Sequence, residues 1–486
     1  MNIKIFNIAI LLMVLSVLAS CAKWTDVKPS IEVRSKLVFS DEATVQEALN
    51  GVYGRMTQTA GYGRNMTWGF VDVMGEVYNG TQLANYEIEA VNGRFNNTSA
   101  EQVIEQMWNN TYTAIANANN LISSIEEADP AIFSGDSKNR IKGEALGLRA
   151  MLHFDLLRLF GPAVGSTAWN QPILPYVTVY SSHVTPRNTG PDIITRLLED
   201  LQVAEDLLKE DPIRMTSVLD ELRARKVRFN YYAVKALQAR IYLWIGDKPK
   251  ALEAATVVIN AVSEKFPWTT RAGVEETKTN TFYDYILSSE NIFSLYVNNL
   301  RTYIDTKLVN IAVDASVTPK YLAHYSTTEE IRQEVYEAAG PGVTDFRNIL
   351  MIGEEQWEGT LNALLYKKLH QGEESTNSNK KRPQTYAANR IPLIKTAEMF
   401  YVAAECLADT HPDQAVGYLN TVRTNRGMDD QYLLPTNLSP ADVHAEIRKE
   451  YRKEFPCEGQ FFYYRKRMGE RNYILPLPQW EQEYGF

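Results

Sequence analysis

The chain has 486 residues, of which 45% are hydrophobic and 22% are charged, a composition typical of a globular protein with a sizeable core. Its 59 acidic and 50 basic residues give a net charge of −9, which argues against a polyanionic ligand such as nucleic acid and favours a neutral one. Only three cysteines are present, so a disulfide scaffold and a cysteine-rich zinc site are excluded.

The N-terminus has the layout of a secretory signal, with one early charge, an apolar run from Ile5 to Leu18 and small residues before Cys21. A transmembrane helix needs about 20 apolar residues, so this run is too short. The sequence Leu-Ala-Ser-Cys resembles the lipobox of bacterial lipoproteins, whose cysteine is acylated and becomes the mature N-terminus. We expect a lipoprotein signal peptide at 1–20 and a lipidated tether at 21–37, the alternative being a plain signal peptide with a chance cysteine.

The first helix is predicted in "SDEATVQEALNGVYGRM", with Ser40 as its cap and a single apolar stripe. Residues 57–98 are rich in glycine, asparagine and aromatic residues without a sustained period, which predicts a long ordered loop region. The segments "WNNTYTAIANANNLISSI" and "RIKGEALGLRAMLHFDLLRLFGP" then predict a helical hairpin, and a further amphipathic helix follows Gly190-Pro191.

The segment "YYAVKALQARIYLWIGDKPKALEAATVVIN" predicts two helices joined at Gly246, with Ala239 and Ala251 at the small positions of a tetratricopeptide repeat. A weaker second copy places Ala403 and Ala415 at the same spacing of 12 residues. These pairs predict a mainly α fold of tetratricopeptide-like helical pairs, interrupted by large loop-rich insertions at about 57–98 and 266–392. The second insertion contains a predicted buried strand, "NIFSLYV".

Both insertions contain aromatic and amide side chains that we expect to be exposed. A flat ring can lie against the apolar face of a sugar while polar side chains bind its hydroxyl groups. The candidate ligand-binding residues are Trp68, Tyr78, Asn79, Tyr86, Trp268, Tyr283 and Tyr285. The alternative for each ring is that it packs the loop onto the helices.

The common catalytic signatures are missing. The six histidines include no His-Glu-x-x-His pair, and the chain has no Gly-x-Ser-x-Gly elbow, no phosphate-binding Walker loop and no dinucleotide fingerprint. We therefore expect no catalytic residue, no metal site and no cofactor, and favour a binding protein over a hydrolase.

Several charged residues have simpler structural interpretations. Arg149 and Arg240 are expected to be buried partners of carboxylates, and Asp72 and Glu76 to be acceptors that stabilise a loop. The alternating signs of "RKEYRKEF" predict a solvated helix face. Whether Cys406 and Cys457 pair stays open.

Five segments, in this order along the chain, resemble the SusD-like (RagB/SusD) family of outer-membrane nutrient-binding lipoproteins. They are "GEALGLRAMLHFDLLRLFG", "TPRNT", "KALQARIYLWIGD", "NRIPLIKTAEMFYVAAECLAD" with "YLNTVRTNRG", and "IRKEYRKEFPCEGQFFYYRKRMG". The resemblance implies one domain over 38–486, with a helical-repeat half and a loop-rich half.

The resemblance also implies a non-catalytic lipoprotein on the outer membrane, facing the cell exterior. Such a protein binds an oligosaccharide or polysaccharide and passes it to a TonB-dependent SusC-like transporter. Two alternatives remain: a peptide-binding protein of the same architecture, and a tetratricopeptide scaffold that binds other proteins.

Overall fold

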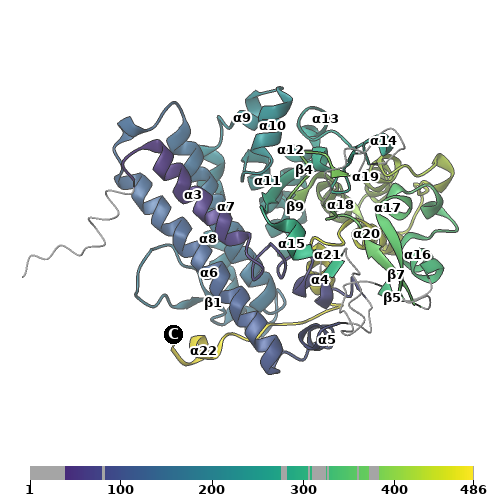
Figure 1. The fold of residues 1–486 in the computed structure, drawn as a ribbon, viewed down its shortest axis with the longest axis horizontal. Helices are drawn as coiled ribbons and strands as arrows, with labels where there is room; N and C mark the ends of the chain where they lie inside the picture. The colour runs from purple at the N-terminus through teal and green to yellow at the C-terminus, as the bar shows by residue number, and fades with distance from the viewer. Residues whose placement is uncertain are drawn as a thin grey trace, which may run out of the picture.

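The computed structural model describes residues 39–78, 83–274, 282–304, 307–308, 324–325, 328–357, 361–371 and 382–484. The protein is mainly helical, with long helices gathered on one side and short strands on the other (Figure 1). Cys21 and the rest of the predicted signal and tether lie outside the described residues.

The longer helices are α3 (Glu42–Met56), α6 (Thr98–Glu127), α7 (Ser137–Phe160), α8 (Gly190–Leu207), α11 (Tyr231–Trp244), α12 (Lys248–Asn260), α16 (Thr328–Tyr336), α18 (Thr396–Leu407), α19 (Pro412–Asn425), α20 (Pro440–Glu454) and α21 (Gln460–Arg467). The shorter helices are α4 (Phe70–Met74), α5 (Asn85–Val91), α9 (Pro212–Met215), α10 (Leu219–Arg225), α13 (Val262–Lys265), α14 (Arg271–Val274), α15 (Leu300–Ile304), α17 (Phe346–Ile349) and α22 (Gln479–Tyr484).

The strands form small sheets. They are β1 (Leu174–Pro175), β2 (Arg187–Asn188), β3 (Phe282–Tyr283), β4 (Asn291–Tyr296), β5 (His324–Tyr325), β6 (Ile352–Trp357), β7 (Leu361–Tyr366), β8 (Arg382–Pro383) and β9 (Arg390–Lys395). The pairs β1–β2 and β4–β9 are antiparallel, β3–β8 is parallel, and β7 lies between β5 and β6 in an antiparallel sheet. The strand predicted from "NIFSLYV" is β4.

The helices pack as a chain of neighbours, from α3 through α6, α7, α8, α11, α12 and α18 to α19 (Figure 1). The hairpin α6–α7 and the repeat pairs α11–α12 and α18–α19 were all predicted from the sequence. Ala239 and Ala251 are fully buried, which lets α11 and α12 approach closely. Gly246 joins these helices at φ 80°, a conformation that glycine adopts without a steric penalty.

Helix α3 begins one residue later than its predicted cap implies. Its N-cap is Asp41, whose carboxylate accepts the backbone N–H of Thr44 at 2.9 Å, and the Thr44 hydroxyl closes a capping box. Ser40 donates its hydroxyl to Asp41 instead of capping the helix. Ser and Asp are nearly equal as caps, so adjacent candidates are hard to separate from sequence.

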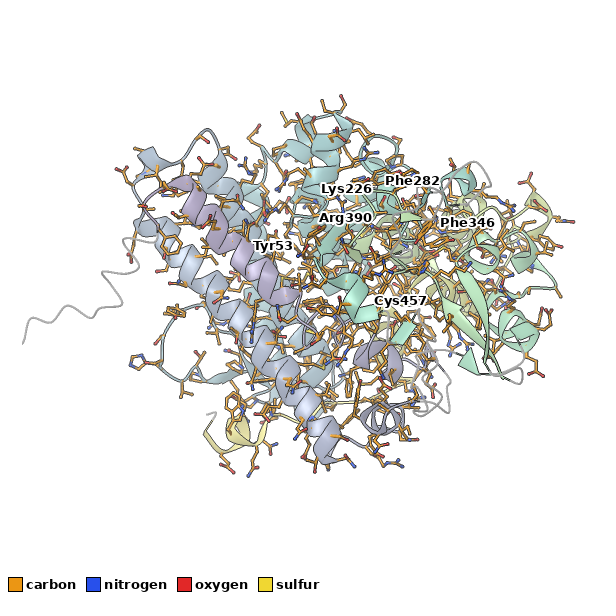
Figure 2. The ribbon with its side chains drawn as sticks, viewed as in Figure 1. Tyr53, Lys226, Phe282, Phe346, Arg390 and Cys457 are labelled. Atoms are coloured by element: carbon orange, nitrogen blue, oxygen red, sulfur yellow. The ribbon has the colours of Figure 1, made fainter. Side chains whose placement is uncertain are left out.

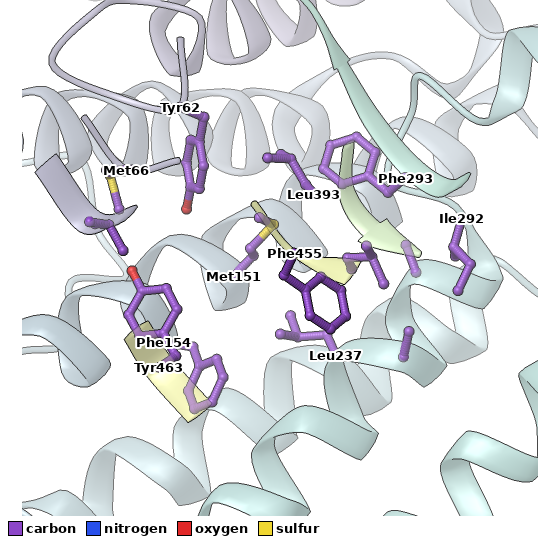
Figure 3. Packing of buried hydrophobic residues seen from close by; sticks show 14 of the residues in the cluster. Tyr62, Met66, Met151, Phe154, Leu237, Ile292, Phe293, Leu393, Phe455 and Tyr463 are labelled. Atoms are coloured by element: carbon purple, nitrogen blue, oxygen red, sulfur yellow. The ribbon is translucent and has the colours of Figure 1, made fainter. Parts of the chain in front are cut away.

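The core joins the two halves of the chain. Figure 3 shows Met151 and Phe154 of α7 close to Leu237 of α11, with Phe293 of β4 and Leu393 of β9 at one side. The segment 57–98 is part of this core, since Trp68 and Phe70 are almost completely buried. Its described residues, 57–78 and 83–98, include α4 and α5, so the prediction of a loop throughout is wrong, and much of the segment packs inside the protein.

The prediction of a solvated face for "RKEYRKEF" holds for Arg448 and Lys449 but is wrong for Glu450, Lys453 and Glu454. On α20, Glu450, Lys453 and Glu454 are buried and take part in a network of ion pairs. Glu454 accepts bonds from Lys395 Nζ at 2.6 Å and from Arg426 Nη2 at 2.9 Å. The burial follows from cationic partners that come from distant segments and satisfy the carboxylates inside the core.

The predictions for the isolated charges are confirmed. Arg149 pairs with Asp200 at 2.6 Å, and Arg240 pairs with Glu398 at 2.5 Å. Asp72 is buried and accepts the backbone N–H groups of Cys457 at 2.6 Å and Gly459 at 2.8 Å, which fixes α4 against the start of α21.

Glu76 pairs with Arg465 at 2.7 Å and therefore holds the end of the α4 segment, as expected of a loop-stabilising acceptor. Cys406 and Cys457 are both buried free thiols, so the structure answers the open question of their pairing.

Candidate functional site

Four of the seven predicted ligand-binding residues are buried, so the expectation that they form an exposed platform is wrong for them. Trp68 is fully buried and its indole N–H donates to the carbonyl of Gly63 at 2.9 Å. The Tyr78 hydroxyl donates to the carbonyl of Trp68 at 3.0 Å. Both side chains have their polar atoms satisfied inside the segment, which makes burial favourable.

Tyr283 and Tyr285 are also buried, in a small second core under the second insertion. Their rings stack with centroids 4.4 Å apart and planes 22° apart. The Tyr283 hydroxyl lies 3.1 Å from Nδ1 of His370. These rings therefore pack inside the insertion, against residues such as Phe346 and Met351, and do not form an exposed platform.

Tyr86 and Trp268 are half-buried, and Asn79 lies outside the described residues. The Tyr86 hydroxyl donates to Glu87 at 2.9 Å, and the Trp268 ring packs against Phe400 with centroids 5.2 Å apart. A binding role for Tyr86, Trp268 and Asn79 stays a prediction.

A different group of side chains lies where the second insertion meets the end of α10. Tyr296, at the end of β4, is 51% exposed and pairs across the strands with Arg390, the first residue of β9. Nearby, the guanidinium of Arg223 lies 4.0 Å from the ring centroid of Tyr386, in the turn before β9. We call these four residues together with Lys226 the Arg390 surface; Lys226 and Arg390 lie close to each other in Figure 2.

The backbone places these side chains together. Lys226 follows Arg223 by three residues at the end of α10, so both lie on one face of that helix turn. The carbonyl of Lys226 accepts the backbone N–H of Ser294 at 2.8 Å, which holds the end of α10 against β4. Arg390 and Tyr296 share one face of the β4–β9 ribbon because they are directly paired.

The cations of the Arg390 surface are poorly compensated. Lys226 is buried and donates to the carbonyl of Ser289 at 2.6 Å, and among the described residues no carboxylate lies within ion-pair distance of it. Arg390 is half-buried, and within the described ranges its Nε has no hydrogen-bond acceptor. Within the part of the chain that the structure describes, Arg223 forms an ion pair with the exposed carboxylate of Asp220, at 3.1 Å, and with no other carboxylate.

Burial and mutual repulsion perturb these groups. Burial, together with the charges of Arg390 and Arg223, lowers the pKa of Lys226 to about 7. Burial also lowers the pKa of Arg390; the charge of Asp284 opposes this effect, and repulsion from Arg223 adds to it. A surface whose cations repel one another attracts an anion or a strong hydrogen-bond acceptor.

Sequence reasoning missed the Arg390 surface. Tyr296 lies near the end of the predicted strand "NIFSLYV", which was expected to be buried. Arg390, however, is 94 residues further along the chain, and only the β4–β9 register brings it beside Tyr296. No local pattern in the sequence predicts that pairing.

A separate pocket is lined by residues of α6 and α22 and of the segment between α7 and α8. This Trp480 pocket has a volume of about 340 Å³, and its lining includes Trp108, Tyr112, His183 and Trp480. Trp480 is 41% exposed, and its indole N–H donates to Glu105 at 3.3 Å. The pocket is apolar, with its ring donors already engaged, so it offers packing surface and few free hydrogen-bonding groups.

Two further observations concern the whole chain. Within the described ranges, none of the helices combines the length and apolar character that a membrane crossing requires. Across the same part of the chain, His, Cys, Asp and Glu side chains form no cluster of three or more suited to holding a metal ion.

Comparison with known proteins gives two family matches, in consecutive parts of the chain. The family model described as "Starch-binding associating with outer membrane" matches residues 23–243, and the model described as "SusD family" matches residues 301–476.

Full-length relatives agree with these matches. The chain is 23% identical to SusD-like protein P2 of Formosa agariphila, over 90% of each chain. A SusD superfamily protein of Bacteroides thetaiotaomicron has a similar fold, with a TM-score of 0.67 and 23% identity over 92% of this chain and 98% of that one. A SusD-like carbohydrate binding protein of Bacteroides vulgatus aligns with a TM-score of 0.64 and 19% identity, over 88% of this chain and 83% of that one.

Proposed function

The chain belongs to the SusD family, and from that premise we propose that it is a cell-surface lipoprotein that captures oligosaccharide or polysaccharide for uptake. One family match is described as starch-binding, and a similar structure is named as a carbohydrate binding protein. Neither names the ligand of this chain, so the proposal depends on what its own surface can bind.

The observation that carries the proposal is the pair of tyrosines on the Arg390 surface. Tyr296 presents a ring to solvent, and Tyr386 is held under the guanidinium of Arg223. A pyranose ring can stack on such phenol rings while neighbouring guanidinium groups donate hydrogen bonds to its hydroxyl groups. We propose that this surface, on the loop-rich half, is the glycan site.

We propose that the bound glycan is delivered to a transporter, which requires a lipid anchor and a membrane partner. We propose that Cys21 carries the lipid that holds the protein on the outer membrane, facing outward. A TonB-dependent SusC-like transporter then receives the glycan, with the helical half of this protein against it. We further propose that the protein binds its ligand without chemical change.

Glycan binding by the purified mature protein tests the proposal. Calorimetry against a panel of neutral and acidic oligosaccharides is expected to give affinities between millimolar and micromolar, since an exposed platform contributes only a few kcal/mol after ordering costs. Tyr296→Ala and Tyr386→Ala should each weaken glycan binding, whereas Trp480→Ala, in the Trp480 pocket, should not.

Each other outcome points to a different function. Loss of binding only in Trp480→Ala would move the site to the Trp480 pocket. Binding of peptides but no glycan would identify the peptide-binding alternative. Cleaved glycan after incubation would show a hydrolase, and partners other than a large barrel, recovered from solubilised outer membrane, would favour the scaffold.

A further inference from the structure

We infer that the glycan bound at the Arg390 surface is anionic, and that Arg390 and Arg223 contact its carboxylate or sulfate groups. This inference rests on the proposed function and names the class of its ligand. It also departs from the expectation, drawn from the net charge, that a neutral ligand is favoured.

The first argument is the contrast with the other buried cations. Arg149, Arg225 and Arg240 are each paired with a carboxylate at 2.5–2.8 Å. Charged side chains inside proteins are normally paired in this way, because removing a charge from water is costly. Among the described residues, buried Lys226 and half-buried Arg390 have no carboxylate partner; buried Lys466 also lacks one, but its Nζ donates to three backbone carbonyls.

The second argument is that the nearby acids are already engaged. Asp284 accepts the backbone N–H of Ser288 at 2.9 Å and its hydroxyl at 2.6 Å. Glu290 is bound by Arg426 at 2.7 Å. Both carboxylates attract Lys226 from a distance, but neither reaches it as an ion-pair partner.

The third argument is a pair of unsatisfied polar atoms on one face of the β4–β9 ribbon. Ser294 lies two residues before Tyr296, so the two side chains point to the same face, as does Arg390. Ser294 is fully buried and its Oγ has no hydrogen-bond partner within the described residues, and Arg390 Nε has none either. Unsatisfied buried polar atoms are rare, and the unpaired Nε of Arg390 leaves its guanidinium poorly compensated beside the exposed ring of Tyr296.

The net charge of −9 is compatible with binding an anionic glycan at the Arg390 surface. Charges are screened over about 8–10 Å at physiological ionic strength, so a bound group senses mainly the cations beside it. A guanidinium binds carboxylate and sulfate oxygens through parallel N–H groups, with stronger bonds than it makes to neutral hydroxyls. Beside the rings of Tyr296 and Tyr386, this chemistry fits a sugar that carries an acidic group.

The test compares acidic glycans with neutral forms of the same chain. The probes are uronic-acid oligosaccharides and their carboxyl-reduced counterparts, together with sulfated oligosaccharides and their desulfated counterparts. Calorimetry on the full mature protein should show binding that is at least about tenfold tighter for an acidic form than for its neutral partner. The affinity should fall as salt is raised.

Variants then assign the effect to the Arg390 surface. Arg390→Gln and Arg223→Gln should each weaken binding of the acidic probe by about tenfold, and Arg390→Lys should retain part of it. Arg94→Gln removes one exposed charge elsewhere and should leave affinity unchanged. Lys226→Met should weaken acidic binding while raising the melting temperature, because it removes a buried cation that lacks a carboxylate partner.

The outcomes separate this inference from the proposed function. Equal or tighter binding of the neutral forms would overturn the inference and leave glycan capture standing. Binding of the acidic probe that all the variants retain would also overturn it. Binding of neither series, nor of any neutral glycan in the panel, would overturn the proposed function as well.

Discussion

Glu450 of α20 illustrates how one carboxylate is kept charged inside the core. It is completely buried and lies 2.8 Å from Nη2 of Arg347, 3.1 Å from Nη1 of Arg423 and 3.5 Å from Nζ of Lys453. Burial alone would raise the pKa of Glu450, but these three cations outweigh burial and lower it to about 2. The folded pKa is therefore below the ordinary value of 4.5. The stability that this group contributes is present above pH 4.5 and is lost as the pH falls towards 2.

Glu450→Gln is expected to destabilise the protein by about 3–5 kcal/mol at pH 7, because it leaves buried cations without their partner. The wild type should also lose stability between pH 4.5 and 2 more steeply than the variant, since the variant lacks this titrating group. Denaturant unfolding at several pH values measures both effects. Glu126→Gln breaks an exposed pair with Lys142 and should cost only about 0–1 kcal/mol. Equal losses in the two variants would contradict the account.

Glu450 also shows why the sequence wrongly predicted a solvated helix face around it. Alternating charge in "RKEYRKEF" is the pattern of a solvated helix face, and it is also the pattern of a helix whose carboxylates meet distant arginines. Arg347 is about 100 residues before Glu450 in the chain, and nothing local indicates that it lies beside α20. Arg149 and Arg240 were predicted correctly because each lies among mainly apolar residues of its helix, where burial is the simplest interpretation.

Among the elements, α7 is the helix against which several others pack. It contacts α6 on one side and α8 on the other, and 20 of its residues are buried. Gly147 lets it approach Phe229, since a Cβ at that position would lie 2.4 Å from the Phe229 ring. The glycine is thus required by close packing of the helix, in spite of its low helix propensity.

Gly147→Ala therefore has two opposed effects. Alanine improves helix propensity by up to about 1 kcal/mol, but overpacking a core costs about 1–3 kcal/mol, so net destabilisation is expected. Gly51→Ala, in α3, meets nothing within 4 Å and should stabilise the protein by about 0.5–1 kcal/mol. Thermal unfolding of both variants tests the contrast. A stabilised Gly147→Ala protein would show that Phe229 can move away freely.

Elements with a strong helical period could be predicted from sequence, whereas the candidate site could not. The small residues of α11–α12 and α18–α19, and the apolar stripe of α7, each lie within one continuous segment. The Arg390 surface instead depends on the register between β4 and β9 and on the end of α10. Trp68 and Tyr283 were misplaced because aromatic residues in a segment without a period give no sign of which side they face.

At the scale of the whole molecule, the proposed function requires that binding and anchoring are separate. The Arg390 surface lies on the second insertion, beside α10, far in sequence from Cys21. A lipid at Cys21 would hold the protein at the membrane whether or not a glycan is bound. More than one acyl chain is needed for stable anchoring, since a single chain binds membranes only marginally.

Cys21→Ala is therefore expected to release the protein from the outer membrane without changing glycan affinity, because the cysteine serves only for lipid attachment. Fractionation of cells that produce the variant should move the protein from the membrane to the soluble fraction, and calorimetry should give the wild-type affinity. Arg390→Gln is the matched control, since it should stay in the membrane and lose binding of the acidic probe. Proteolysis of intact cells would show whether the anchored wild type faces outward. A Cys21→Ala protein that stays in the outer membrane, or a wild type whose mature N-terminus carries no lipid by mass spectrometry, would contradict the lipid anchor.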